Sequence, residues 1–401
     1  MNDVLVFGLL FAAIAIGWFL GRRQGAPKAV APDLPSQYYK GLNYLLDGRQ
    51  DGAVDAFINA LEVNSETLET HIALGNLLRK KGEVARAIRI HQNLLARPSL
   101  PRSQVHQAHL ELARDYISAG LLDRAERLLL DLVQESTEQR RASHRHLLDI
   151  YQSERDWPSA IAQAEALLPR KSLLKGSAPA ENDGAQPVPV VLAHLHCELA
   201  QEALERSDLH SAREELVRAL ARDKDCVRAS LLLGDVERRA GNTKLAVKTL
   251  RKVRHQDADF VPETIEPLRQ CYADLGDRQS LRQYLRECLE QNPVAPVVLA
   301  LAEDLLANDG EAVAREFLTQ QLSQQPSLRG LGRLISLQQA VASDPARENL
   351  EALYRLVEQL VAERPLYRCS HCGFTGQQLH WFCPGCKYWG TVRTLHSHNN
   401  E

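Results

Sequence analysis

Residues 234–250 read GDVERRAGNTKLAVKTL, and this short segment indicates the architecture of most of the chain. Gly234 belongs to one helical segment, Ala240-Gly241-Asn242 is a turn signal, and Ala246 and Leu250 belong to a second, amphipathic segment. Small residues such as Gly234 and Ala246 let two antiparallel helices approach closely, while larger residues such as Leu250 fill the seams between neighbouring units. The segment therefore predicts a helical hairpin.

The same arrangement recurs along the chain at a nearly constant period. Successive equivalent positions are 33 to 38 residues apart, with one step of 52 residues, and they are Ala53, Ala87, Ala125, Ala160, Ala212, Ala246, Leu281 and Ala314. Turn signals separate the two halves of the units, at Asp47-Gly48, Lys81-Gly82, Ala119-Gly120, Leu275-Gly276-Asp277 and Asn308-Asp309-Gly310. A helix–turn–helix repeat of this length resembles the tetratricopeptide family, although the usual first-helix tryptophan is absent. We predict an all-α, right-handed tetratricopeptide solenoid of about eight helical hairpins over residues 36–327, because a plain bundle has no fixed period.

Three segments depart from the repeat. Residues 24–35 form a Pro/Ala linker, which predicts a semi-extended spacer. An insertion over residues 171–190 accounts for most of the 52-residue step and predicts a surface loop. Residues 328–364 keep a helical pattern and are expected to cap the solenoid before the boundary at Pro365.

The last domain, residues 365–401, contains two identical cysteine motifs. They are Cys369-Ser-His-Cys372 and Cys383-Pro-Gly-Cys386, and ten residues separate them. Two residues between thiols let one tight turn direct both sulfur atoms at one ion, and two such turns complete a tetrahedron. We predict a small zinc-ribbon or rubredoxin-like domain in which all four cysteines bind one Zn²⁺ or Fe ion. Two disulfides or a redox-active CxxC motif are the alternatives, and a reducing compartment disfavours both.

Other cysteines and histidines carry weaker signals. Four scattered cysteines are expected to be buried apolar residues of helices; they are Cys197, Cys226, Cys271 and Cys288. Two histidine pairs predict solvated or partly buried side chains, because residues two apart point to different faces of a helix; they are His144 with His146 and His194 with His196. Four more histidines surround the ribbon, but the cysteines already complete a tetrahedral site; they are His371, His380, His396 and His398.

Trp381 and Trp389 lie in the ribbon, which otherwise has little apolar core of its own. We expect them to pack the ribbon against the protein's own solenoid, because the connection from the last helix is short. Docking of a partner and stacking of nucleic-acid bases are the alternatives.

The N-terminal segment predicts a membrane anchor over residues 1–23. Val4 to Leu20 read VLVFGLLFAAIAIGWFL, and a helix of this length spans about 26 Å, enough to cross a thin bilayer. A cleaved signal peptide would normally begin with positive charge, whereas the positive residues Arg22 and Arg23 follow the apolar run. These arginines should stay on the cytoplasmic side, so nearly the whole chain should face the cytosol.

Composition and motifs argue against catalysis and against nucleic-acid binding. The chain of 401 residues has a formal net charge of −3, so no nucleic-acid partner is expected. The sequence contains no P-loop, no HExxH, no GxSxG and no glycine-rich dinucleotide turn. We therefore predict a protein that is not an enzyme.

The order of anchor, repeat array and CSHCGF/CPGC ribbon resembles the lipopolysaccharide assembly protein B family of Gram-negative bacteria. The resemblance implies a regulatory adaptor of the inner membrane, with Cys369, Cys372, Cys383 and Cys386 as metal ligands. It also implies partners: a membrane-bound ATP-dependent protease, the deacetylase that commits precursors to lipid A, and other lipopolysaccharide-assembly membrane proteins. The adaptor would promote proteolysis of that deacetylase. Two alternative functions remain: a general membrane-tethered scaffold for envelope assembly, and an iron-containing electron carrier. The sequence also leaves open whether the protein forms a homo-oligomer.

Overall fold

A computed structural model describes residues 68–96, 100–169 and 185–395, together with the isolated positions 18, 40, 43, 44, 52 and 56. The chain divides into two compact units, Met1–Leu132 and Val133–Glu401. The predicted anchor (apart from Trp18), the spacer over 24–35 and most of the insertion over 171–190 lie outside the described residues. Among the residues that are described, no helix is long and apolar enough to cross a membrane.

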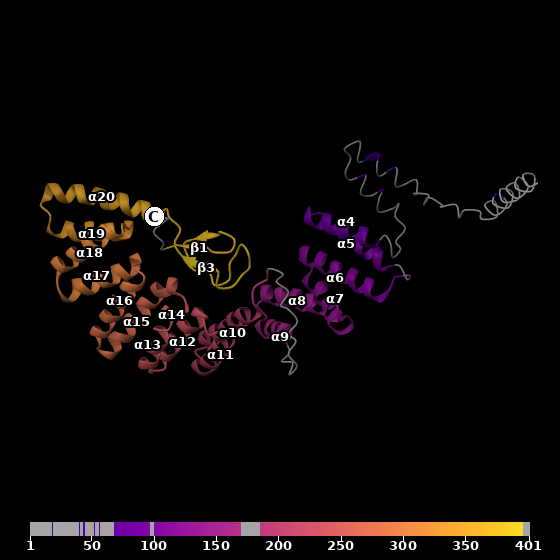
Figure 1. Cartoon of the computed structure of the whole chain (residues 1–401), viewed down its shortest axis with the longest axis horizontal. Helices are drawn as coiled ribbons and strands as arrows, with labels where there is room; N and C mark the ends of the chain where they lie inside the picture. The colour runs from indigo at the N-terminus through magenta and orange to yellow at the C-terminus, as the bar shows by residue number, and fades with distance from the viewer. Residues whose placement is uncertain are drawn as a thin grey trace, which may run out of the picture. The chain divides into compact units, whose positions relative to one another are not determined.

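Consecutive antiparallel helices make up nearly all of the described structure (Figure 1). In the first unit these are α4 (Leu68–Lys80), α5 (Val84–Leu95) and α6 (Arg102–Ser118), and α7 (Leu122–Glu135) crosses the division between the units. The second unit continues with α8 (Arg140–Glu154), α9 (Trp157–Leu167), α10 (Val188–Glu205), α11 (Leu209–Arg222), α12 (Val227–Arg239), α13 (Thr243–Leu250), α14 (Val253–Gln256), the 3₁₀ helix η1 (Ala258–Phe260), α15 (Val261–Leu275), α16 (Arg278–Gln291), α17 (Ala295–Asn308), α18 (Glu311–Gln324), α19 (Leu328–Val341) and α20 (Asp344–Ala362). The predicted helical-repeat solenoid is therefore confirmed over the described part of the chain.

Small residues bring the two helices of a hairpin together, as the sequence predicts. A Cβ atom on Gly234 of α12 would lie 2.6 Å from Cδ2 of Leu250 on α13, and one on Gly75 of α4 would lie 2.4 Å from Nε2 of His91 on α5. Ala246 is likewise fully buried. Any larger side chain at these positions would push the helices apart.

Left-handed residues end the first helix of many hairpins. Gly241 and Gly276 have φ angles of 81° and 69°, values that glycine adopts without steric penalty. Arg155 after α8 and Ser207 after α10 adopt the same conformation, with φ of 60° and 61°. The turn signals of the sequence missed these two non-glycine positions.

A recurring cap begins the second helix. Asp156, Asp208 and Asp277 each accept a hydrogen bond from the backbone amide of a serine three residues later, at 3.2, 3.0 and 3.1 Å. Such a cap satisfies one of the amides that has no partner in the first turn of a helix.

A buried ion network joins three helices of the first unit. Arg79 of α4 contacts the carboxylates of Glu111 and Asp115 on α6 at 2.8 and 2.7 Å. The other oxygen of Asp115 lies 2.5 Å from Nδ1 of His91 on α5. Because these charged and polar groups are largely buried and bonded to one another, the network fixes how the helices pack, while Nε2 of His91 has no hydrogen-bond partner among the described residues.

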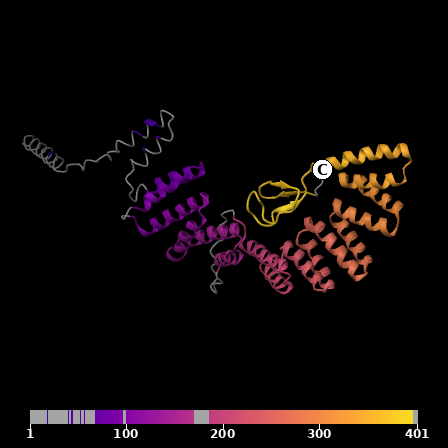
Figure 2. The same ribbon diagram turned by 180° about the vertical axis from the view of Figure 1, so that it is seen from behind.

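The ribbon contains a small antiparallel sheet with strand order β2-β1-β3. Its strands are β1 (Tyr367–Cys369), β2 (Thr375–Gly376) and β3 (Val392–Thr394). Figure 2, which shows the fold from behind, and Figure 1 both place these strands beside helices of the second unit.

Candidate metal centre and its docking on the array

Two matching turns present the four cysteines. In the first, the amide of Gly373 donates to the carbonyl of Cys369 at 3.0 Å, and in the second, Lys387 donates to Cys383 at 2.9 Å. Gly373 and Lys387 are both left-handed, with φ of 78° and 61°. The local sequence thus folds each CxxC motif into the same turn.

The four sulfur atoms converge on one point. All lie within 4.8 Å of one another. Sγ of Cys369 lies 3.8 Å from Sγ of Cys386, and Sγ of Cys372 lies 3.7 Å from Sγ of Cys383. A tetrahedral Zn²⁺ with Zn–S bonds of about 2.3 Å requires sulfur atoms about 3.8 Å apart. A disulfide needs sulfur atoms about 2.05 Å apart, so the described geometry fits a four-thiolate metal site and not two disulfides.

Glycine and backbone amides complete the site. A Cβ atom on Gly385 would lie 3.2 Å from Sγ of Cys372, so the turn leaves space for the sulfur atoms. The amide of Cys372 approaches Sγ of Cys369 at 3.5 Å, and Oγ1 of Thr391 lies 3.3 Å from the same sulfur. These donors favour thiolate, the form that binds metal.

The thiols have unequal acidity in the metal-free protein. Burial tends to raise the pKa of Cys369, but hydrogen bonds from Thr391 and from the amides of Cys372 and His371 outweigh it and lower the pKa to about 6. Burial raises the pKa of Cys386 to about 12. Protons must leave protonated thiols when a cation binds, so metal affinity is expected to rise with pH.

Trp389 is the main contact of the ribbon with the array. Only 3% of its surface is exposed. Its Nε1 donates to Oε1 of Gln152 at 2.6 Å, and its backbone amide and carbonyl bind the side chain of Gln186 at 2.9 and 2.5 Å. Its ring meets Trp157 edge-on, with centroids 6.5 Å apart, and the guanidinium of Arg228 lies 5.9 Å from its centroid. The ribbon is therefore held by apolar and polar contacts at once.

His194 of α10 lies between the two ribbon tryptophans. Its ring stacks on Trp389 with centroids 5.2 Å apart and lies 6.1 Å from that of Trp381. Trp381 also stacks on Phe260 of η1 at 5.4 Å. Gly390 allows this approach, since a Cβ atom there would lie 2.9 Å from Nε2 of His194. Burial, with a smaller effect of Arg228, lowers the pKa of His194 to about 3, so the ring is neutral.

Polar contacts continue along strands β1 and β3. The hydroxyl of Tyr367 donates to Glu263 of α15 at 2.9 Å. Arg393 forms ion pairs with Asp257 and Asp259 at 3.0 and 3.3 Å. The array surface therefore matches the ribbon in charge as well as in shape.

The structure agrees with some of the expectations for single residues and contradicts others. It brings together all four predicted ligands, and it confirms that Cys197, Cys226, Cys271 and Cys288 are buried. His371 stacks on Tyr388 at 4.2 Å, and His396 and His398 lie outside the described residues. The expectation of solvated or partly buried side chains was wrong for His194 and His196, which are 4% and 6% exposed. His194 contacts the ribbon, whereas His196 lies 2.7 Å from Glu215, because the two side chains leave α10 on different faces.

Sequence reasoning missed the array side of this contact. Gln152, Gln186, His194 and Arg228 carry no motif, and they become a set only through packing. The aromatic residues of the ribbon and its short connection to the last helix predicted docking on the array, but not the array residues involved.

Comparison with known protein families agrees with both parts of the structure. Residues 197–259 match the tetratricopeptide repeat family, and residues 367–394 match a family described as a rubredoxin metal binding domain. The chain is thus a helical-repeat protein that carries a four-cysteine metal-binding module.

Relatives from two species match nearly the whole chain. Lipopolysaccharide assembly protein B of Escherichia coli (strain K12) is 38% identical over 394 residues, and the protein of the same name from Haemophilus influenzae is 35% identical over 402 residues; each match covers 98% of both chains. The chain belongs to the lipopolysaccharide assembly protein B family. A solved fragment of a tetratricopeptide protein from Cytophaga hutchinsonii covers 66% of this chain at 12% identity, with a TM-score of 0.41, and the family assignment does not depend on it.

Proposed function

We propose that this protein is an adaptor, anchored in the inner membrane, that regulates lipopolysaccharide synthesis from the cytoplasmic side. The observation that carries the proposal is the match over 98% of the chain to relatives named for lipopolysaccharide assembly. Helical-repeat arrays of this kind bind partners over extended surfaces and need no catalytic residue. The proposal includes a membrane anchor over residues 1–23 and the domain boundaries that the sequence predicts.

The metal centre has a structural role in this proposal. Cys369, Cys372, Cys383 and Cys386 would hold one Zn²⁺, with iron as the alternative, and the ion would supply a cross-link between the two turns. The described part of the ribbon, residues 365–395, has three short strands, so the free energy of metal binding would also stabilise its fold. A folded ribbon can present Trp389 to the array, so docking of the ribbon would depend on metal binding.

The proposed action is to promote proteolysis of the deacetylase that commits precursors to lipid A, by a membrane-bound ATP-dependent protease. The adaptor would bring the two proteins together and would act stoichiometrically. Its other partners would be membrane proteins of lipopolysaccharide assembly.

The half-life of the deacetylase in living cells tests this proposal. We expect depletion of this protein to lengthen the half-life severalfold and overproduction to shorten it, as measured by immunoblotting after protein synthesis is stopped. A variant with Arg347→Gln, a change on the exposed surface of α20, serves as the control and should restore the normal half-life. An unchanged half-life on depletion would rule out the adaptor and favour a general membrane-tethered scaffold for envelope assembly.

A further inference from the structure

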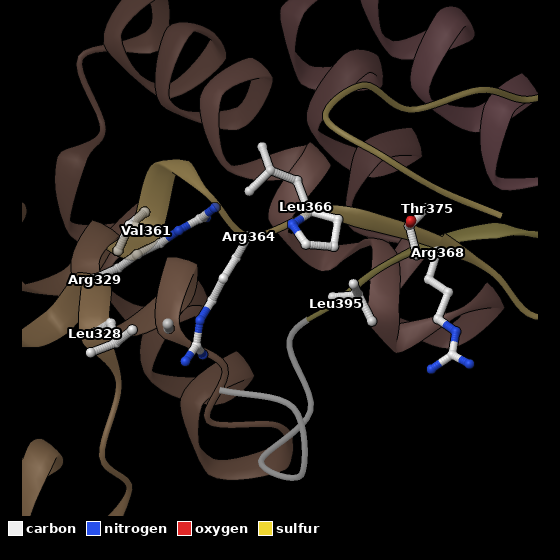
Figure 3. A pocket seen from close by; sticks show the side chains of 10 residues that line it. Leu328, Arg329, Val361, Arg364, Leu366, Arg368, Thr375 and Leu395 are labelled. Atoms are coloured by element: carbon white, nitrogen blue, oxygen red, sulfur yellow. The ribbon is translucent and has the colours of Figure 1, made fainter. Parts of the chain in front are cut away.

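A separate cavity lies where the ribbon meets the last helices of the array. This cavity of about 280 Å³ opens between α19, α20 and the strands of the ribbon (Figure 3). Its apolar wall includes Leu328, Val361, Leu366 and Leu395. None of the four proposed metal ligands lines it, so the cavity is separate from the metal centre.

Three arginines from three different elements surround this cavity. Arg329 comes from α19, Arg364 from the connection after α20, and Arg368 from β1, as Figure 3 shows. Within the described part of the chain, none of these guanidinium groups forms an ion pair, and no acidic residue lines the cavity.

Arg364 supplies the strongest indication of a ligand. Its Nη1 atom is buried and has no hydrogen-bond partner among the described residues. A buried donor of a charged group without an acceptor is destabilising, so native proteins usually provide one. Arg364 also lines the cavity, so a rotation of its side chain would bring the guanidinium group to an acceptor bound there.

We infer that this cavity binds a phosphate monoester carried on a small apolar group. A phosphate monoester carries a charge of about −1.5 to −2 at pH 7, and its several oxygens suit the planar donor fork of arginine. A single carboxylate would leave more of the positive charge uncompensated. The apolar wall fits the remainder of the ligand, and the volume lies near the lower limit of small-molecule sites, which are typically about 300–1,000 Å³.

Calorimetric titration of the full chain in a neutral detergent tests this inference, with phenyl phosphate as the probe. We expect saturable binding that weakens about tenfold or more in Arg364→Gln and in Arg368→Gln, because each variant loses a charge-assisted hydrogen bond. Arg368 is exposed, so that variant should fold normally even if Arg364→Gln does not. Arg347→Gln removes the same charge from α20 outside the cavity and should bind as the wild type does.

Two further arms identify the source of the phosphate. Competition by phosphatidic acid in the micelles, but not by phosphatidylcholine, would indicate a lipid headgroup, and absence of competition would indicate a soluble ester. Both results support the phosphate chemistry. Equal affinity in wild type and both cavity variants would overturn it, as would binding of a glutamate-rich peptide in place of phenyl phosphate.

Discussion

His194 shows how much one side chain can contribute to joining two domains. Its imidazole is stacked on Trp389 and close to Trp381, and Nδ1 is buried without a hydrogen-bond partner among the described residues. A charged imidazolium in this position would face the guanidinium of Arg228 and would have little water around it. The docked ribbon therefore requires a neutral histidine.

Acidification should loosen the ribbon through this residue. The pKa of His194 is about 3 in the docked state and near its usual 6.5 when the ring is released. Between these two pKa values His194 is protonated only in the undocked state, so the free energy that favours docking falls as the pH falls below 6.5. The loss between pH 7.5 and pH 5.5 should be about 1.4 kcal/mol. The amide protection factors of residues 379–392, which correct for the slower intrinsic exchange at low pH, should fall about tenfold in this range. The fall should be smaller in His194→Leu; equal pH dependence in both proteins would contradict this.

The metal ligands allow a prediction at the same scale. Cys383→Ser should abolish stoichiometric metal binding and unfold the ribbon, because three thiolates leave the tetrahedron incomplete. Elemental analysis should find about one metal ion per wild-type chain and far less in the variant. Cys271→Ser, at a buried cysteine of α15, is the control and should keep the metal. A full complement of metal in Cys383→Ser would contradict the four-cysteine site.

At the scale of single elements, the hairpins were predictable because their contacts are local. Gly234 and Leu250 are 16 residues apart, so both lie within one repeat, and the repeating pattern of small and large residues predicts their contact. Left-handed turns were predictable where glycine marks them, as at Gly241, but not at Arg155 and Ser207. At those two positions the packed helices impose a left-handed conformation that the residue type does not predict.

Replacing Ser207 by glycine should therefore stabilise the protein. A non-glycine residue in the left-handed conformation carries a penalty of about 1 kcal/mol, partly offset by the greater freedom of glycine in the unfolded chain. We expect Ser207→Gly to raise the free energy of unfolding by about 0.5 kcal/mol, measured by denaturant titration with circular dichroism. The reverse change, Gly241→Ser, should lower it by about 1 kcal/mol. Destabilisation by Ser207→Gly would show that the serine makes a compensating contact.

At the scale of the whole second unit, the ribbon contact explains what the sequence could not predict. The expectation that the ribbon packs on its own array agrees with the structure, but Trp389 and not Trp381 is the more deeply buried tryptophan. Gln152 and Trp389 are 237 residues apart, and no periodic pattern relates them. The convergence of the four cysteines was predictable because each CxxC motif is local, whereas the docking face depends on how several hairpins stack.

Trp389→Ala should separate the ribbon from the array without removing the metal. The change removes a fully buried indole and the hydrogen bond to Gln152, for a loss of about 3–5 kcal/mol. Limited proteolysis should then cleave near Pro365 much faster, while elemental analysis still finds the metal. Trp381→Ala removes a partly exposed ring and should have the smaller effect. Loss of metal in Trp389→Ala would show that the ribbon cannot fold without the array.

The distance in sequence between Trp389 and its partners also affects how the protein is made. At about 5–20 residues per second, a ribosome needs roughly 10 to 50 s to add the 237 residues between Gln152 and Trp389. During that interval the ribosome makes α9 to η1, and the surface to which the ribbon binds stays uncovered. A nascent chain therefore passes through a stage in which Trp157, His194 and Phe260 are accessible to chaperones. This stage ends when the last residues are translated and the ribbon covers the surface.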